Sequence, residues 1–168
     1  LLTYLAINSN DIRNVCPAIG SGFKVIFHKP NEIPSPLHSS YFVPLGQRKA
    51  FTLTATLTTT NENLREYSPD IRKCYFQGER QLKYFKTYTK TNCEYECMAN
   101  DTLKQCECVK FSMPRSPDIK VCGTNKIMCN YQAMRLWPQD DDEIYPCNCL
   151  PTCTDIKSAS KVISDCIS

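Results

Sequence analysis

The stretch Asn92–Cys108 reads NCEYECMANDTLKQCEC and places four cysteines within seventeen residues. The first two are spaced C-x3-C and the last two C-x-C. Thr91, followed three residues later by Glu94, has the pattern of a capping box, so a helix is predicted to begin there. On such a helix Cys93 and Cys97 share one face, four residues apart. Whether these cysteines bind a metal, exchange electrons or form disulfides decides the fold.

The spacing of the cysteines disfavours both a metal site and a redox centre. Structural zinc sites use paired C-x2-C knuckles or Cys/His combinations, and thiol redox centres also use C-x2-C. The chain contains no C-x2-C, and its two histidines, His28 and His38, lie far from the cysteine-rich stretch. Twelve cysteines in 168 residues, an even number at short spacings, instead predict disulfides and an oxidising compartment. We therefore expect no metal and no cofactor.

Length, charge and hydropathy narrow the class of protein further. A chain of 168 residues is the size of one domain, or of one domain with an appendage. Its net charge of +3, with no arginine-rich run, argues against a nucleic-acid partner. No apolar run approaches the roughly 20 residues of a membrane-spanning helix, and the first residues do not have the pattern of a signal peptide. We expect such a chain to be a piece of a longer extracellular protein.

The density of cysteines divides the chain near Cys74. One cysteine precedes it, and ten lie between Cys74 and Cys153. This division predicts a β region over residues 1–73, a cysteine-rich module over 74–153 and a return strand over 154–168. The expected fold class is α+β and disulfide-rich.

Hydrophobic periodicity predicts one strand and a second helix. Residues 50–60, AFTLTATLTTT, alternate with period two, so the strand is expected to be half-buried with threonines on its wet face. The residues of its apolar face are Phe51, Leu53, Ala55 and Leu57. The second helix is predicted over about 124–136, and both helices are short enough to need crosslinks or tertiary contacts. Its apolar stripe consists of Ile127, Met128, Tyr131 and Met134.

Geometry favours one arrangement of the disulfides. Cys93 and Cys97 are about 6 Å apart along a helix, and Cys147 and Cys149 about 6.6 Å apart on one side of an extended segment. The two pairs could therefore meet as rungs of a ladder. Nested order would pair Cys97 with Cys147, Cys93 with Cys149 and Cys74 with Cys153, and in a second cluster Cys106 with Cys129 and Cys108 with Cys122. Spacing alone does not choose among the many other pairings that ten cysteines permit.

An ordered series of phrases from Arg72 to Arg115 carries a family resemblance. The stretch RKCYFQGERQLKYFKTYTKTNCEYECMANDTLKQCECVKFSMPR presents a cysteine, YFKTYT, NCEYEC, CEC and MPR in that order, and CNCLPTC at Cys147–Cys153 closes the series. GSGFKVIFHKPNEIP, from Gly20, is similar to an upstream strand of the same family. Together these stretches resemble the extracellular region of the degenerin/epithelial sodium channels, in particular the insect pickpocket branch.

The resemblance implies a set of disulfides, a domain organisation and a function. The implied disulfides are Cys74–Cys153, Cys93–Cys149, Cys97–Cys147, Cys106–Cys129 and Cys108–Cys122. They would lace a two-helix thumb beside a β-sheet palm. The implied protein is a subunit of an amiloride-sensitive, sodium-selective channel in the cell membrane, where three like or unlike subunits surround the pore. This chain would lie on the extracellular side and transmit signals, while membrane helices outside it would conduct sodium ions.

Some candidate features stand apart from that ladder. Cys16 and Cys166 could pair with each other or with cysteines outside this chain. Asn100, in the chain's only N-x-S/T sequon, is a candidate glycan acceptor. Five glycines form no phosphate-binding loop and no Ser-His-Asp arrangement is evident, so an enzyme is not expected. The alternative to a channel subunit is a free-standing secreted, cysteine-rich binding or inhibitor module.

Overall fold

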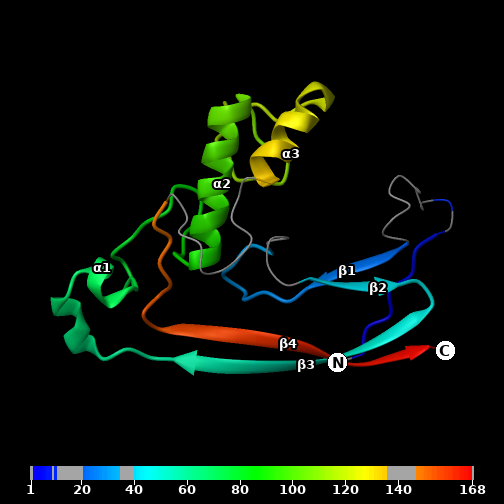
Figure 1. Ribbon diagram of the computed structural model, residues 1–168, viewed down its shortest axis with the longest axis horizontal. Helices are drawn as coiled ribbons and strands as arrows, with labels where there is room; N and C mark the ends of the chain where they lie inside the picture. Colours follow the sequence, from blue (N-terminus) through cyan, green and yellow to red (C-terminus); the bar gives the residue numbers. More distant parts are fainter. Residues whose placement is uncertain (1, 9, 11–20, 35–39, 136–146, 168) are drawn as a thin grey trace.

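The computed structural model describes residues 2–8, 10, 21–34, 40–135 and 147–167. Two small sheets, short helices and five disulfides make up the disulfide-rich α+β fold that the sequence predicts (Figure 1). Along the chain the elements are β1 (Gly22–Ile26), β2 (Ser40–Pro44), β3 (Gln47–Thr58), η2 (Glu62–Glu66), α1 (Pro69–Arg72), α2 (Lys90–Cys106), η3 (Thr124–Lys126), α3 (Ile127–Arg135) and β4 (Asp155–Ile167).

Each sheet is an antiparallel pair of strands. β1 pairs with β2, and the long strand β3 pairs with β4 from Gln47 opposite Ile167 to Thr58 opposite Asp155. Because β3 leads toward the helices and β4 returns from them, the far end of this ribbon brings the two connections to the helical part close together. In Figure 1, α2 rises away from the ribbon with α3 beside it, while η2 and α1 lie at the end of the ribbon.

Three aromatic rings join the two sheets. Phe27, Tyr41 and Phe51 lie with ring centroids 5.0 to 6.1 Å apart, in tilted or edge-on arrangements. The Tyr41 hydroxyl also donates to the backbone carbonyl of Ser160 on β4. Edge-on aromatic contacts add to the stabilisation that comes from burial alone, so this cluster fixes β1–β2 against the middle of the β3–β4 ribbon.

The expectation that β3 is half-buried is wrong beyond Phe51. The strand itself is present, but the side chains of Leu53 and Leu57 are 57% and 62% exposed. Phe27 and Tyr41 make their ring contacts with β3 at Phe51, near the middle of this twelve-residue strand, and the leucines beyond it stay exposed. Alternation of residue type therefore predicted the strand correctly, but it did not predict whether the apolar face of the strand is buried.

The N-cap of helix α2 lies two residues before the predicted cap, Thr91. Thr89 is the N-cap, and its side chain accepts a hydrogen bond from the backbone N–H of Asn92 at 3.1 Å. Thr91 lies inside the first turn, and Glu94 is therefore too late in the helix to complete a capping box. The helix ends at Cys106 and is capped by Glu107, a left-handed residue whose N–H donates to the carbonyl of Leu103. Its buried face packs in a core formed by Tyr95, Cys97, Met98, Ala99, Val109 and Met113.

The second predicted helix is confirmed, as η3 followed by α3, up to the end of the described range at Arg135. Its predicted apolar stripe is largely exposed, since Ile127, Met128 and Tyr131 all face solvent. Met134 packs against the core around α2, and Ala133 is buried beside Cys106–Cys129. The short helix is thus fixed by one turn and a disulfide rather than by its whole apolar stripe.

Candidate functional site: the base of the disulfide-laced module

Five disulfides run through residues 74–153, hereafter the helical module. Cα atoms of the paired cysteines are 4.9 to 6.1 Å apart, within the range that disulfides normally span. The pairs, in the nested order, are Cys74–Cys153, Cys93–Cys149, Cys97–Cys147, Cys106–Cys129 and Cys108–Cys122. Three of them join α2, or Cys74 ahead of it, to the return segment 147–153. The other two join the C-terminal end of α2 and the residue Cys108 after it to α3 and to the loop before α3.

One premise of the geometric ladder is wrong. The segment Cys147–Cys149 is not extended, because Asn148 between the two cysteines is left-handed with φ of 49°. Leu150 donates its N–H to the carbonyl of Asn148 at 3.1 Å, which makes this a turn. Cys16 lies outside the described residues, and so does the side chain of Cys166; their pairing stays a prediction.

The chain enters and leaves the module through a neck formed by Cys74, Tyr75, Thr152 and Cys153. Tyr75 donates its N–H to the carbonyl of Pro151, and Cys153 donates its N–H to the carbonyl of Tyr75, both at 2.9 Å. The Cys74–Cys153 disulfide lies beside these bonds. Covalent and backbone links therefore hold the two crossings together.

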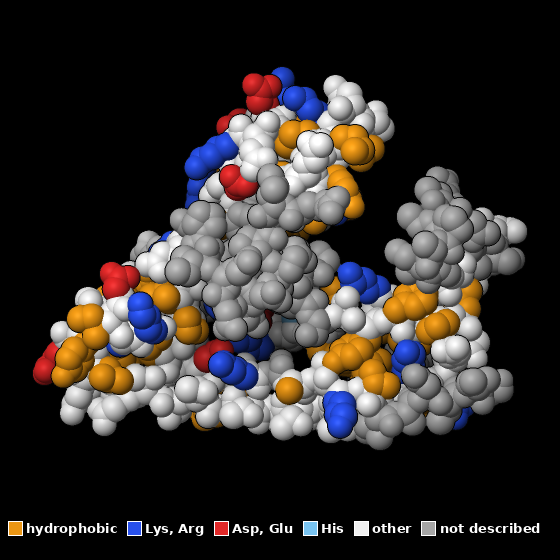
Figure 2. All heavy atoms as spheres, in the orientation of Figure 1, with side chains coloured by type: hydrophobic (Ala, Val, Ile, Leu, Met, Phe, Trp, Pro, Cys, Tyr) orange, Lys and Arg blue, Asp and Glu red, His pale blue; other side chains and the backbone are white. Residues whose placement is uncertain are grey.

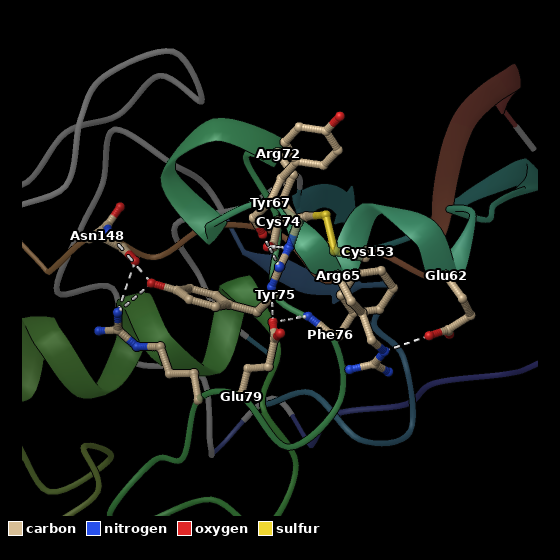
Figure 3. A network of polar contacts seen from close by, with 11 residues as sticks. Glu62, Arg65, Tyr67, Arg72, Cys74, Tyr75, Phe76, Glu79, Asn148 and Cys153 are labelled. Atoms are coloured by element: carbon tan, nitrogen blue, oxygen red, sulfur yellow. Dashed lines mark hydrogen bonds and ion pairs between the residues drawn. A yellow bond between two sulfur atoms is a disulfide. The ribbon is translucent and has the colours of Figure 1, made fainter.

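A buried arginine supports the outer side of the neck (Figure 3). The Arg72 side chain is only 2% exposed, and it donates to the carbonyls of Tyr67 and Cys74 at 2.6 and 3.0 Å. Its guanidinium also pairs with the Glu79 carboxylate, which accepts the Phe76 N–H at 2.7 Å. Burial alone would raise the pKa of Glu79, but the bonds from Phe76 and Arg72 outweigh it and lower that pKa.

Phe76 lies between two arginines. The guanidinium carbons of Arg65 and Arg72 lie 4.1 and 4.8 Å from its ring centroid. Arg65, on η2, also pairs with Glu62 at 2.5 Å. Cation–π contacts of this kind are worth most where the cation is desolvated, so Arg72 is the stronger of the two partners. These contacts fix η2 and α1 onto the neck.

A second arginine holds the return segment from the inner side. Arg80 donates to the carbonyls of Cys147 and Asn148 and to the hydroxyl of Tyr75. Tyr75 packs edge-on against Tyr88, with ring centroids 5.3 Å apart. The Tyr88 hydroxyl donates to the carbonyl of Leu150 at 2.7 Å, and burial raises the pKa of Tyr88. The return segment is thereby tied to the residues that precede α2.

The loop His28–Ile33, which follows β1, reaches the module from the other side. Lys29 bonds both Glu32 at 2.8 Å and Asp155, the first residue of β4, at 2.7 Å. Burial alone would lower the pKa of Lys29, but hydrogen bonds to Asp155 and Glu32 raise it. A hollow of about 670 Å³ lies between this loop, the start of α2 and the start of β4. Residues from all three segments line it, among them Lys29, Ile33, Lys90, Glu94, Asp155 and Ile156.

Exposed apolar side chains gather at the end of the ribbon. Figure 2 shows them over η2 and α1, where Leu64, Tyr67 and Ile71 are 37%, 52% and 70% exposed. Among the residues that the structure describes, no helix is both long and apolar enough to cross a bilayer. Within the same ranges, no three His, Cys, Asp or Glu side chains gather where they could hold a metal ion.

The sequence analysis did not identify several residues at the base of the module. Arg72, Glu79 and Arg80 lie inside the phrases that carry the family resemblance, but their charges follow no recognisable local pattern. Asn92 and Lys29 are also missed, because their partners lie 59 and 126 residues away in the chain. Asn100 is exposed on α2.

A family model described as "Amiloride-sensitive sodium channel" matches residues 2–164. The chain belongs to the amiloride-sensitive sodium channel family. Pickpocket protein 28 of Drosophila melanogaster is 29% identical over 150 residues, which cover 86% of this chain and 25% of that protein. Pickpocket protein 11 of the same species is 30% identical over 138 residues, covering 79% and 26%. The predicted family and its insect pickpocket branch are thus confirmed.

Similarity to curated proteins extends beyond insects. The human bile acid-sensitive ion channel is 28% identical over 102 residues, which cover 58% of this chain and 18% of that protein. The chain spans about a quarter of the length of the two pickpocket relatives. That human relative is named as an ion channel.

Proposed function

We propose that the chain is the extracellular part of a subunit of an amiloride-sensitive, sodium-selective channel. It would lie outside the cell membrane and carry extracellular signals toward a pore formed by flanking membrane helices. Residues 74–153 would be the thumb, and residues 1–73 and 154–168 the matching part of the palm. Like or unlike subunits, three in number, would surround the pore through which sodium ions pass.

The neck is the observation that supports signal transmission best. A disulfide and two backbone hydrogen bonds join Cys74–Tyr75 to the segment Pro151–Cys153, and Arg72 and Arg80 hold the neighbouring carbonyls. Sub-ångström displacements are transmitted by packed, bistable elements and are absorbed by soft ones. A module crosslinked five times and fixed at its neck is suited to move as one lever on the β3–β4 ribbon.

The test is expression of the complete subunit, with the sequence that flanks this chain in its gene, in oocytes. An inward current that amiloride blocks, and that disappears when sodium is replaced by a large organic cation, is expected. A current carried equally by potassium would contradict sodium selectivity. Flanking sequence without apolar segments of about 20 residues, together with secretion of a soluble product, would overturn the channel proposal and favour the secreted module.

A further inference from the structure

The amide of Asn92 connects the first turn of α2 to the loop His28–Ile33. Its Oδ1 accepts the N–H of Ile33 at 3.0 Å, and its Nδ2 donates to the carbonyls of Asn31 at 2.9 Å and Thr87 at 3.2 Å. Asn92 is 1% exposed, so its side-chain amide is buried. Both N–H donors of that amide and its oxygen acceptor take part in hydrogen bonds. Such a buried polar side chain is expected to fix one arrangement of its neighbours.

The same loop is held at its other end by charge. Lys29 bonds Asp155 at the start of β4 and Glu32 within the loop. Nδ1 of His28 lies 2.9 and 3.0 Å from the carbonyls of Lys29 and Glu32, within reach of a hydrogen bond to either. The loop thus contacts β4 through Lys29 while it continues directly from β1.

Apolar packing adds a third contact. Ile33 packs against the core cluster of the helical module, which includes Tyr95 and Met98 of α2. Phe27, between the end of β1 and this loop, belongs to the aromatic cluster with Tyr41 and Phe51. One short loop therefore joins the module, the β1–β2 sheet and the first residue of β4.

We propose that Asn92 and Lys29 form a latch by which movement of α2 reaches the β1–β2 sheet. This latch would be a second route of transmission, in addition to the neck. The functional part of this inference rests on the proposed role of the chain in signal transmission. Unlike the neck, the latch contains no disulfide crosslink, so it can open and close without a covalent bond being broken. The hollow beside it, lined by Lys29, Ile33 and Asp155, gives the loop space on the side facing α2 and β4.

The first test is hydrogen exchange of the full-length subunit. Asn92→Ala should accelerate exchange of the Ile33 amide by about tenfold, because its acceptor is removed. Asn92→Asp keeps an acceptor for Ile33 and loses the donors, so it should have a smaller effect at that amide. The matched control is Gln105→Ala, which removes an exposed amide of the same helix, bonded locally to Asp101. Unchanged exchange at Ile33 in Asn92→Ala would overturn the latch.

A double-mutant cycle tests whether the two anchors act on one loop. Lys29→Met should also accelerate exchange over residues 28–33, and combination with Asn92→Ala should give less than the product of the two separate effects. Independent, multiplicative effects would contradict a single latch.

The second test separates transmission from a purely structural tie. At equal surface expression, Asn92→Ala should change the current that amiloride blocks by about fivefold, and Gln105→Ala should leave it at the wild-type value. If Asn92→Ala accelerates hydrogen exchange in the loop but leaves the current at the wild-type value, transmission through the latch is overturned. Absence of current in the wild type as well would refute the proposed function, while the exchange result would still decide the latch.

Discussion

Cys153 donates its backbone N–H to the carbonyl of Tyr75 at 2.9 Å, directly beside the disulfide from Cys74 to Cys153. The exit from the helical module is therefore paired to its entrance residue by residue, and not by sulfur alone. This relationship predicts how much each kind of link contributes.

Replacing Cys74 and Cys153 together by serine should destabilise the chain by about 3 kcal/mol, less than a lone crosslink over 79 residues would suggest. The next rung, Cys93–Cys149, already confines the neighbouring segments, so the outer rung closes only a short remaining loop. Urea unfolding under non-reducing conditions, which keep the other four disulfides intact, measures the difference. An unchanged midpoint would mean that the backbone pairing of Tyr75 holds the neck alone.

Arg72→Met should cost about 2 kcal/mol, because the carbonyls of Tyr67 and Cys74 lose a buried donor. Arg72→Lys should restore little of this, since an ammonium group does not reproduce the fork of a guanidinium. Thermal or urea unfolding gives the comparison. Arg65→Met is the control, as its pair with Glu62 is largely exposed and should contribute less than about 1 kcal/mol. Equal losses at the two arginines would contradict the importance of burial.

The pKa of Glu79 is lowered in the folded chain, which predicts a stability that depends on acid. A carboxylate with a depressed folded pKa contributes stability that is fully present above its ordinary pKa of 4.5 and is lost as pH falls through the folded value. Wild type should therefore lose more stability than Glu79→Gln between neutral pH and the acid side of pH 4.5. The free energy of unfolding, measured for both across this range, should converge at low pH; parallel curves would contradict the prediction.

Glu107 separates Cys106 from Cys108 with a φ of 60°, a conformation that costs an L-residue about 1 kcal/mol. Glu107→Gly should relieve that cost and stabilise the chain, by less than the full amount because glycine loses more conformational freedom on folding. Gln105→Gly, two residues earlier in the last turn of α2, should instead destabilise by up to about 1 kcal/mol, the cost of glycine in a helix interior. Differential scanning calorimetry of the two variants should show shifts of opposite sign.

The sequence predicted most of the module and little of its base, for physical reasons. Local signals decide that α2 and α3 are helices, and the family phrases indicate which cysteines are partners. The cap is Thr89 and not Thr91, although only Thr91 is followed by a glutamate three residues later. Threonine is a favoured N-cap at either position, and the bond from the Asn92 N–H to the Thr89 side chain selects Thr89. By contrast, Arg72, Asn92 and Lys29 act through backbone carbonyls or distant charges, which no local periodicity reports.

The exposed apolar face of β3 illustrates the same limit. Alternation at Leu53 and Leu57 indicates a strand, but whether that face is covered depends on what packs on it. Ring contacts from Phe27 and Tyr41 cover Phe51, whereas Leu53 and Leu57 stay more than half exposed. Burial of a strand is therefore a property of the partners, which the residues of that strand alone do not determine.

Asn100 should carry an N-linked glycan, attached before α2 is complete. Asn100 is exposed in the helix, whereas Thr102, the third residue of the sequon, is 1% exposed with a buried hydroxyl. A sequon whose threonine is buried in a 17-residue helix cannot be presented as a surface loop once the chain has folded. Secreted expression should give a product whose mass falls on deglycosylation, and Asn100→Gln should remove that difference. Folded, unglycosylated chain should resist glycosylation in vitro. Ready modification of the folded chain would contradict the proposed order of glycosylation and folding. No change in the mass of the secreted chain on deglycosylation would refute the glycan itself.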